Sequence, residues 1–179
     1  IINRMGFNNF GIDKLVSSLE QTNCLVPIGI NVGKNKITPL ENAVDDYVSC
    51  FKQGWKTGDY FAVNISSPNT KDLRQLQGED YLAPLLKKLT ETRDELNQKY
   101  GSQKPVWLKI APDLTAEELE TIAGTALDAG IDAIIATNTT IQRENIFHSN
   151  KTQQGGLSGR PLLSKSNQVL KDLYQITSG

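Results

Sequence analysis

The chain has 179 residues, with 19 lysines and arginines against 20 aspartates and glutamates, so its formal net charge is −1. This balance argues against nucleic acid as a partner, because a nucleic-acid-binding surface needs a clustered basic excess. With 38% hydrophobic and 22% charged residues the chain is too apolar for a disordered protein, and it lacks the run of about 18 apolar residues that spans a bilayer. Two cysteines, Cys24 and Cys50, are too few for a disulfide framework, and no metal-ligand spacing is present, so we predict no metal site.

Both ends of the chain resemble cuts through a longer protein. The sequence begins Ile1-Ile2-Asn3, without an initiator methionine or the layout of a signal peptide, and it ends shortly after an apolar helical run. We therefore expect further segments upstream and downstream, and we expect the present chain by itself to be soluble.

Four short apolar runs predict strands, at residues 26–32, 61–66, 105–111 and 131–137. Each run is almost continuously apolar, which is typical of parallel strands that are covered on both faces. Helical patterns lie between these strands at residues 44–51 and 82–89. Further helical patterns surround Leu15 and run from 161 to about 176. The clearest helix follows Thr115, which forms a capping box with Glu118, and Gly130 stands where a left-handed C-terminal cap belongs.

Alternating strands and helices predict a parallel sheet in an α/β protein. Two architectures fit this order, an open doubly wound sheet and part of a (β/α)₈ barrel. Because a complete barrel needs about 250 residues, this chain would form roughly its first half to two-thirds. In either architecture ligands bind beyond the carboxyl ends of the strands.

Polar residues follow each predicted strand, with asparagine after three of the four, at Asn31, Asn64, Asn69 and Asn138. An amide offers donors and an acceptor together, so such a group suits a small planar ligand with N–H and C=O groups. Asparagine also caps helices and forms turns, which explains one such segment as well as a site does. The recurrence favours a shared site, and so does Lys109 within an apolar strand, because a buried lysine needs an anion or a cofactor oxygen.

Other motifs give weaker indications of function. Residues 29–35 (GINVGKN) lack the spacing of a phosphate loop, and the glycine loop 155–159 (GGLSG) is no nucleophile elbow, although it could bring backbone N–H groups near a ligand. The single histidine, His148, lies in a polar stretch that predicts an exposed loop. Without a usable histidine or metal, a bound cofactor is the more plausible source of reactivity.

Six segments, taken in order and spacing, carry a family resemblance: 3–9 (NRMGFNN), 29–36 (GINVGKNK), 64–70 (NISSPNT), 109–114 (KIAPDL), 136–140 (ATNTT) and 155–161 (GGLSGRP). With them the chain resembles the class 2 dihydroorotate dehydrogenases, the quinone-linked flavoenzymes of pyrimidine (UMP) biosynthesis. The resemblance covers essentially the whole chain. It implies a (β/α)₈ barrel with FMN at the carboxyl ends of the strands, of which residues 1–179 would form a single incomplete FMN-binding domain.

The resemblance also implies roles for individual residues. Ser67 matches the catalytic base, and Thr70 is our candidate for a second hydroxyl that relays its proton. Substrate-binding positions are matched by Asn3, Arg4, Met5, Gly6, Phe7, Asn64, Asn69, Asn138 and Thr139. FMN-binding positions are matched by Asn31, Asn64, Lys109, Thr137 and Gly159.

Serine at position 67 indicates class 2, because class 1 enzymes carry cysteine there. The resemblance therefore implies dihydroorotate and orotate as ligands, a quinone as electron acceptor, and peripheral attachment to the cytoplasmic side of a bacterial inner membrane through a segment outside this chain. One departure is Lys71-Asp72, where many relatives have Pro-Gly in a loop expected to close over the substrate.

Two alternatives remain open at the level of sequence. One is another FMN-dependent barrel oxidoreductase, such as a dihydropyrimidine or dihydrouridine dehydrogenase, in which we expect cysteine rather than serine as the proton-transfer residue. The other is a non-catalytic barrel domain that binds a small molecule. A visible spectrum of the intact protein, and bleaching of its flavin bands by dihydroorotate, would distinguish these functions.

Overall fold

The computed structural model describes residues 1–144 and 146–179 and contains a four-stranded parallel sheet. Its strands are β2 (Gly29–Val32), β3 (Tyr60–Asn64), β4 (Val106–Lys109) and β5 (Ala133–Ile135), in the spatial order β2-β3-β4-β5. The predicted strand positions are confirmed, but each strand is shorter than its apolar run. The residues beyond each strand end form turns and loops, which carry the polar segments singled out in the sequence.

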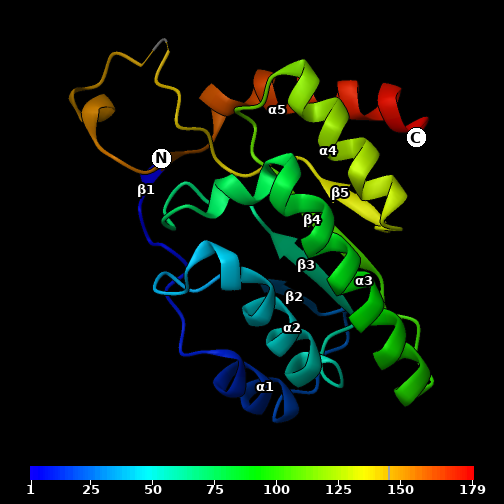
Figure 1. Cartoon of the computed structure of the whole chain (residues 1–179). Helices are drawn as coiled ribbons and strands as arrows, with labels where there is room; N and C mark the ends of the chain where they lie inside the picture. Colours follow the sequence, from blue (N-terminus) through cyan, green and yellow to red (C-terminus); the bar gives the residue numbers. More distant parts are fainter. Residues whose placement is uncertain (145) are drawn as a thin grey trace.

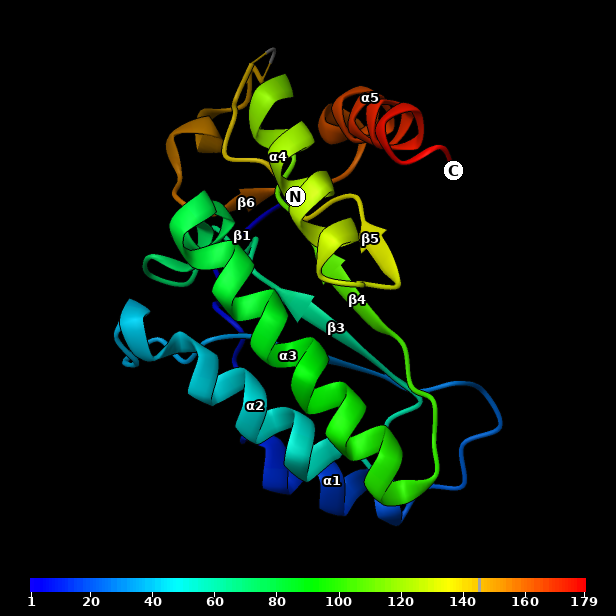
Figure 2. The same ribbon diagram turned by 45° about the vertical axis from the view of Figure 1, so that its right-hand side comes forward.

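The α-helices form a layer over one face of this sheet (Figures 1 and 2). They are α1 (Ile12–Glu20), α2 (Ala43–Gly54), α3 (Glu79–Tyr100), α4 (Ala116–Asp128) and α5 (Arg160–Thr177), and each packs against the next in sequence. Short 3₁₀ helices η1 (Leu40–Asn42), η2 (Leu73–Gln77) and η3 (Ser149–Thr152) lie in the connections. Strand–helix units repeated around a curved sheet are the building units of a (β/α)₈ barrel, and this chain forms part of one.

The core lies between the sheet and the helices. Side chains of β3 that point toward the helices, such as Phe61 and Val63, are fully buried, and Phe61 packs on Phe51 and Trp55 of the α2 segment with ring centroids 4.6 and 5.1 Å apart. The opposite face is more open, since burial alternates along β2 and β4. The expectation that every strand is covered on both faces holds for β3, whose residues 61–64 are all buried, but not for β2 and β4, whose inner face is partly exposed.

A small antiparallel sheet joins distant parts of the chain. Strand β1 (Ile2–Asn3) pairs with β6 (Gly156–Leu157), and Thr140 bridges to Leu157 beside it. This pairing holds the N-terminal segment against the loops that follow the parallel strands. Among the described residues, no helix is both long and apolar enough to cross a membrane.

Candidate functional site

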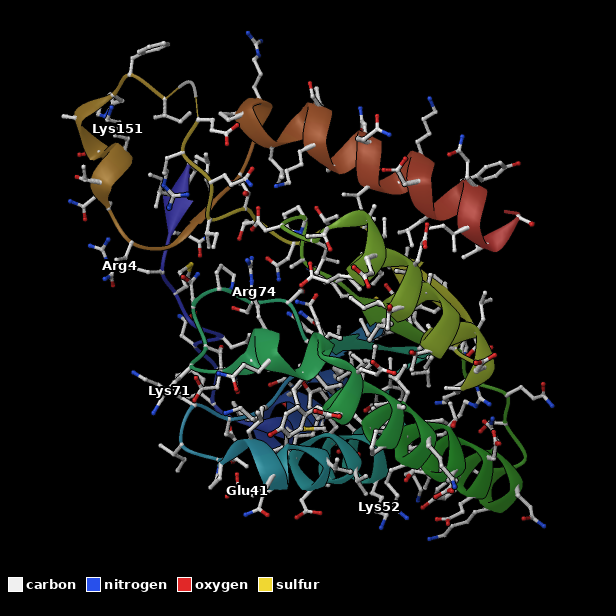
Figure 3. The ribbon with its side chains drawn as sticks, turned by 45° about the horizontal axis from the view of Figure 1, so that its top comes forward. Arg4, Glu41, Lys52, Lys71, Arg74 and Lys151 are labelled. Carbon is white, nitrogen blue, oxygen red and sulfur yellow. The ribbon has the colours of Figure 1, made fainter. Side chains whose placement is uncertain are left out.

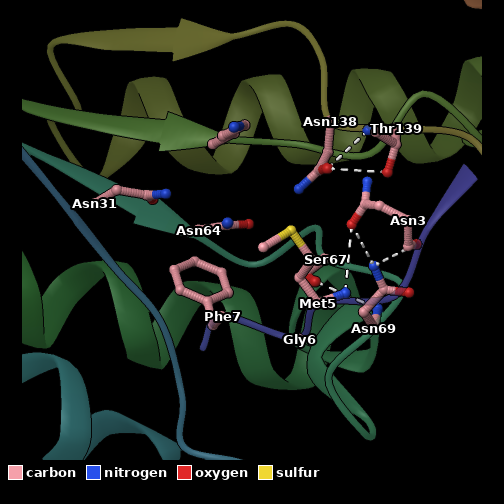
Figure 4. Close-up of a pocket in the computed structure, with 11 residues that line it drawn as sticks. Asn3, Met5, Gly6, Phe7, Asn31, Asn64, Ser67, Asn69, Asn138 and Thr139 are labelled. Atoms are coloured by element: carbon pink, nitrogen blue, oxygen red, sulfur yellow. Dashed lines mark hydrogen bonds between the residues drawn. The ribbon is translucent and has the colours of Figure 1, made fainter. Parts of the chain in front are cut away.

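A polar pocket of about 240 Å³ lies at the carboxyl ends of the parallel strands (Figure 4). Its lining comes from the N-terminal segment and from the strands and the loops that follow them: Asn3, Met5, Gly6, Phe7, Asn31, Asn64, Ser67, Asn69, Lys109, Asn138 and Thr139. Residues up to 136 positions apart in sequence thus share one small cavity. This is the place where the parallel-sheet rule puts a ligand.

Strand register brings three of these side chains together on the face away from the helices. Asn64 pairs directly with Lys109 on the neighbouring strand, and Asn31 lies on the next strand over, opposite Ala62. Because alternate residues of a strand point to the same face, Ala62 and Asn64 point to the side that Asn31 and Lys109 share. The buried hydroxyl of Tyr47 donates a hydrogen bond of 2.9 Å to the Asn64 carbonyl oxygen, which fixes this strand end from the helix side.

The glycine loop allows the N-terminal segment to reach the pocket. A side chain at Gly155 would collide with the Asn3 backbone, and one at Gly156 would collide with the Thr139 side chain. Gly155 also has a φ of +125°, which L-residues rarely adopt. These glycines therefore permit close packing of the chain between Asn3 and Thr139. This packing explains the glycine loop 155–159, for which the sequence indicated no definite role.

The N-terminal segment turns sharply as it crosses the pocket. Gly6 and Phe7 both have positive φ, 66° and 61°, and the Phe7 ring faces Gly33 at the end of β2. A phenylalanine in this backbone region is strained, and such strain is concentrated at binding and catalytic sites. Asp72, in the loop that follows Ser67, also has a positive φ of 59°.

Hydrogen bonds fix four of the five asparagine side chains of the pocket, and those between Asn3 and Asn69 are drawn in Figure 4. Asn69 Nδ2 donates to the backbone oxygen of Asn3 at 3.0 Å and to its Oδ1 at 3.3 Å. The Ser66 hydroxyl donates to Asn64 Oδ1 at 2.8 Å and accepts from Asn138 Nδ2 at 3.1 Å. The amides are therefore held in set orientations by the protein before any ligand is considered.

Ser67 lines the pocket and has 7% of its surface exposed. Its Oγ accepts a hydrogen bond from the Asn69 backbone N–H at 3.3 Å. Thr70 is equally buried, and within the described part of the chain its Oγ1 has no hydrogen-bond partner. A buried hydroxyl without a hydrogen-bond partner destabilises the folded state. Thr70 is therefore a candidate for a functional role.

The charge of the pocket comes from Lys109. Its side chain is half-buried rather than fully buried as the sequence suggested, because it lies on the pocket face of β4 and not on the helix face. No carboxylate is among the lining residues, so the pocket favours a ligand with negative charge or carbonyl oxygens. The deeply buried lysine is instead Lys34, whose Nζ donates to the backbone oxygens of Asn35 and Thr38 at 2.9 and 2.7 Å.

The cysteines do not take part in this site. Cys24 is exposed, Cys50 lies on α2, and neither lines the pocket. Burial and the nearby Asp46 carboxylate raise the pKa of the Cys50 thiol to about 11, so this thiol is protonated at neutral pH. The described lining of the pocket therefore contains hydroxyl groups but no thiol, carboxylate or imidazole.

Four residues that the sequence assigned to the site lie outside the lining of this pocket. Arg4 points away and its Nη1 donates to Gln153 Oε1 at 3.1 Å, next to two larger cavities. Thr137 donates through Oγ1 to the Asn138 carbonyl, and Gly159 is the N-cap of α5. Thr70, three residues after Ser67 in the same loop, is buried but is not among the lining residues. His148 is exposed in a loop, as predicted.

Sequence reasoning missed Arg74, Gln77 and Asp113, which tie the pocket loops together. Asp113 follows β4 and accepts hydrogen bonds from Thr140, the Ile141 backbone, Arg74 and Lys165. Burial alone would raise the pKa of the Asp113 carboxyl, but these four donors outweigh it and hold that pKa below its usual range. An arginine placed between the buried Leu73 and Leu76 was the available sequence signal.

A parallel strand–helix array with a polar pocket at its carboxyl edge is the arrangement of the (β/α)₈ barrel enzymes. A family model described as dihydroorotate dehydrogenase matches residues 1–179. The chain thus belongs to the dihydroorotate dehydrogenase family.

Individual relatives agree with this membership. A dihydroorotate dehydrogenase (quinone) of Saccharophagus degradans is 50% identical over 174 residues, covering 97% of this chain and 51% of the relative. One from Haemophilus influenzae is 48% identical over 180 residues, covering 100% and 53%. The crystal structure of the Eimeria tenella enzyme in complex with ferulenol superimposes with a TM-score of 0.91 at 38% identity, covering 99% of this chain and 53% of that one. The chain spans about half the length of the relatives it matches.

Proposed function

We propose that the protein containing this chain oxidises dihydroorotate to orotate in pyrimidine biosynthesis, with FMN as cofactor and a quinone as electron acceptor. The observation that supports this most directly is the pocket itself, in which five asparagines, Ser67 and Lys109 share one small cavity. Dihydroorotate is a small ring with alternating N–H and C=O groups and a carboxylate. Asparagine amides and a lysine complement those groups.

Ser67 is the proposed base. Its Oγ takes a proton from C5 of the substrate while its own hydroxyl proton passes through a water to Thr70, which in turn releases its hydroxyl proton toward solvent. A serine hydroxyl is too weak a base without such a relay. A hydride leaves C6, and a double bond forms between C5 and C6. When bound, FMN supplies the acceptor for that hydride.

The residues that would hold FMN are those on the inner face of neighbouring strands. Asn31, Asn64 and Lys109 offer amide groups and a positive charge to the carbonyl oxygens and ring nitrogens of a flavin. The fit rests on this donor set and on a lining without carboxylates. Thr137 and Gly159 are proposed as further FMN contacts on family resemblance.

The remaining lining residues would hold the substrate opposite the flavin. Asn3 and Asn69 are bonded to each other, and Asn138 and Thr139 approach from the loop after β5. Met5, Gly6 and Phe7 cover this side, and Arg4 is carried over to this group on resemblance although its side chain points elsewhere. Such positioning of a flat substrate can contribute about 7–11 kcal/mol to lowering a barrier.

A quinone is the proposed acceptor because the relatives described above are named for it. A lipid-soluble acceptor implies that the protein works at a membrane surface, and we propose the cytoplasmic side of a bacterial inner membrane. Comparing reduction of a short-chain ubiquinone, fumarate and NAD by the full-length protein tests this assignment. Turnover with fumarate or NAD but not with quinone would contradict it.

The decisive experiment on the base is Ser67→Ala in the full-length protein. We expect dihydroorotate turnover to fall at least roughly a hundredfold, which is the lower edge for loss of a general base, with FMN content unchanged. Ser49→Ala, on the exposed side of α2, is the matched control and should leave turnover unaltered. A near-normal rate in Ser67→Ala would remove serine from the role of base.

A further inference from the structure

We propose that Arg74 is a positioning residue, which sets the loops after β3, β4 and β5 relative to one another and thereby holds Ser67 and Asn138 in place over the substrate. This inference rests on the proposed function and adds to it a residue that is not among those lining the pocket. Arg74 belongs to η2, the short helix that follows the Ser67 loop.

The Arg74 guanidinium makes one hydrogen bond to each of three loops. Its Nε donates to the Ser66 carbonyl at 3.0 Å, Nη1 to Asp113 Oδ2 at 2.9 Å and Nη2 to the Thr139 carbonyl at 2.9 Å. These acceptors follow β3, β4 and β5 respectively. One side chain therefore connects the ends of three neighbouring strands.

Two of those acceptors adjoin residues of the pocket directly. The Ser66 carbonyl belongs to the peptide group that precedes Ser67, so its direction sets where the Ser67 side chain starts. The Thr139 backbone N–H donates at 2.7 Å to Asn138 Oδ1, so an anchored Thr139 also orients the Asn138 amide. Displacing either loop would move a proposed catalytic or binding group with it.

Gln77, at the other end of η2, adds a fourth connection. Its Oε1 accepts a hydrogen bond of 2.9 Å from the Ala111 backbone N–H, in the loop after β4. Leu73 and Leu76 of the same helix are fully buried and anchor it in the core. The helix is thus a rigid base from which the two polar side chains reach the loops.

Burial distinguishes Arg74 from a surface charge. Its side chain is 21% exposed and that of its partner Asp113 is 9% exposed, whereas Lys71, three residues earlier, is 78% exposed. In Figure 3 the Lys71 side chain lies at the edge of the molecule, while Arg74 lies among the loops. Lys165 of α5 also donates to Asp113, at 3.1 Å, so the carboxylate is held from two sides.

The chemistry requires arginine in particular. A guanidinium is planar and presents five N–H donors in fixed directions, so it can bond three acceptors in one plane at once. A lysine keeps the charge and the ion pair with Asp113, but its single ammonium at the end of a flexible chain cannot reach three loops in the same geometry. Arg74→Lys therefore keeps the positive charge at this position but removes the hydrogen bonds that connect the three loops.

The chain offers a matched control in Arg93. This arginine lies on α3 with a side chain 16% exposed, and its Nη1 donates to the Gly130 carbonyl at 2.7 Å and to Asp132 at 3.2 Å. Those acceptors precede β5, so they lie at the end of the sheet opposite the pocket. Arg93 thus makes the same kinds of bonds as Arg74 without touching a pocket loop.

The test compares Arg74→Lys and Arg93→Lys in the full-length protein, by melting temperature, by kcat and KM for dihydroorotate, and by calorimetric Kd for orotate. We expect both variants to melt at lower temperature. Only Arg74→Lys should lower kcat, by roughly ten- to a hundredfold, as misplacement of catalytic groups does, and weaken orotate binding. Arg74→Gln, which also removes the charge, should be no less impaired than the lysine variant.

Three other outcomes would contradict either the positioning role of Arg74 or the proposed function. A normal kcat and orotate Kd in Arg74→Lys, with only a lower melting temperature, would reduce Arg74 to a structural residue and overturn the proposal. Equal losses of kcat in Arg74→Lys and Arg93→Lys would overturn it as well, because the effect would then follow stability. A wild-type protein that neither oxidises dihydroorotate nor binds orotate would instead contradict the proposed function, and this inference with it.

Discussion

At the scale of single residues, hydrogen-bonded amides line the pocket, and a buried hydroxyl without a partner within the described structure lies in the same loop as Ser67, outside the lining. Asn64, Asn69 and Asn138 have partners within the protein, so their orientations are set by the fold. Thr70 Oγ1 is buried and lacks a partner among the described residues, although it stands only three positions after Ser67. A buried hydroxyl that has no protein partner is free to bond a water and to pass on a proton.

Thr70→Val tests that role, because it removes the hydroxyl and nearly preserves the shape. We expect kcat to fall at least roughly tenfold, less than for loss of the base itself, whereas the melting temperature should change little because valine nearly preserves the shape of threonine. Thr70→Ser, which keeps the hydroxyl, should retain most of the activity. Full activity in the valine variant, measured by orotate formation, would exclude Thr70 from the relay.

At the scale of elements, helix α4 connects β4 to β5, two of the strands at whose carboxyl ends the pocket lies. It begins at a complete capping box, in which Thr115 Oγ1 accepts from the Glu118 N–H at 3.2 Å and Glu118 accepts from the Thr115 N–H at 2.7 Å. After its last turn Gly130 takes a left-handed φ of 69°. The sequence predicted both signals, because each depends on residues close together in the chain.

Thr115→Ala removes the side-chain half of this box. We expect it to lower the free energy of unfolding by about 1 kcal/mol, since an N-cap threonine contributes on that order. Thr121→Ala, at an exposed position within the same helix, is the control and should be neutral or stabilising because alanine is the better helix former. Urea unfolding followed by circular dichroism measures both, and equal effects of the two substitutions would refute the capping contribution.

At the scale of the whole molecule, Asp113 joins the loops after β4 and β5 to η2 and α5. Its partners Thr140, Arg74 and Lys165 come from three separate parts of the chain. The carboxylate therefore couples the pocket loops to the helix layer, and its charge state bears on the stability of the assembled fold.

The sign of that dependence follows from the lowered pKa of Asp113. A carboxyl whose pKa is lower in the folded than in the unfolded state contributes stability that is present above its unfolded pKa, about 3.9, and is lost as the pH falls through the folded value. Asp113→Asn should therefore unfold more readily at pH 7 and lose less stability than the wild type between neutral and acid pH. Thermal unfolding across this pH range measures the difference.

The sequence alone determined the strand–helix order and the chemistry of the strand ends. Apolar runs and helical periodicity are local patterns, so they located all four parallel strands, and the asparagines and Lys109 followed from their place beyond or within those runs. The family resemblance assigned roles to Ser67 and the amides, and the structure gathers most of those residues into one cavity.

Only the tertiary structure decided which of these side chains meet and what holds them there. Arg74 is an ordinary charged residue in the sequence, and its function as a link between three loops depends on acceptors as far away as Thr139. Likewise Lys109, expected to be buried, is only half-buried, because the direction of its side chain relative to the helix layer is set by packing. Contacts between distant segments depend on how the sheet folds as a whole, and a local pattern carries no information about that.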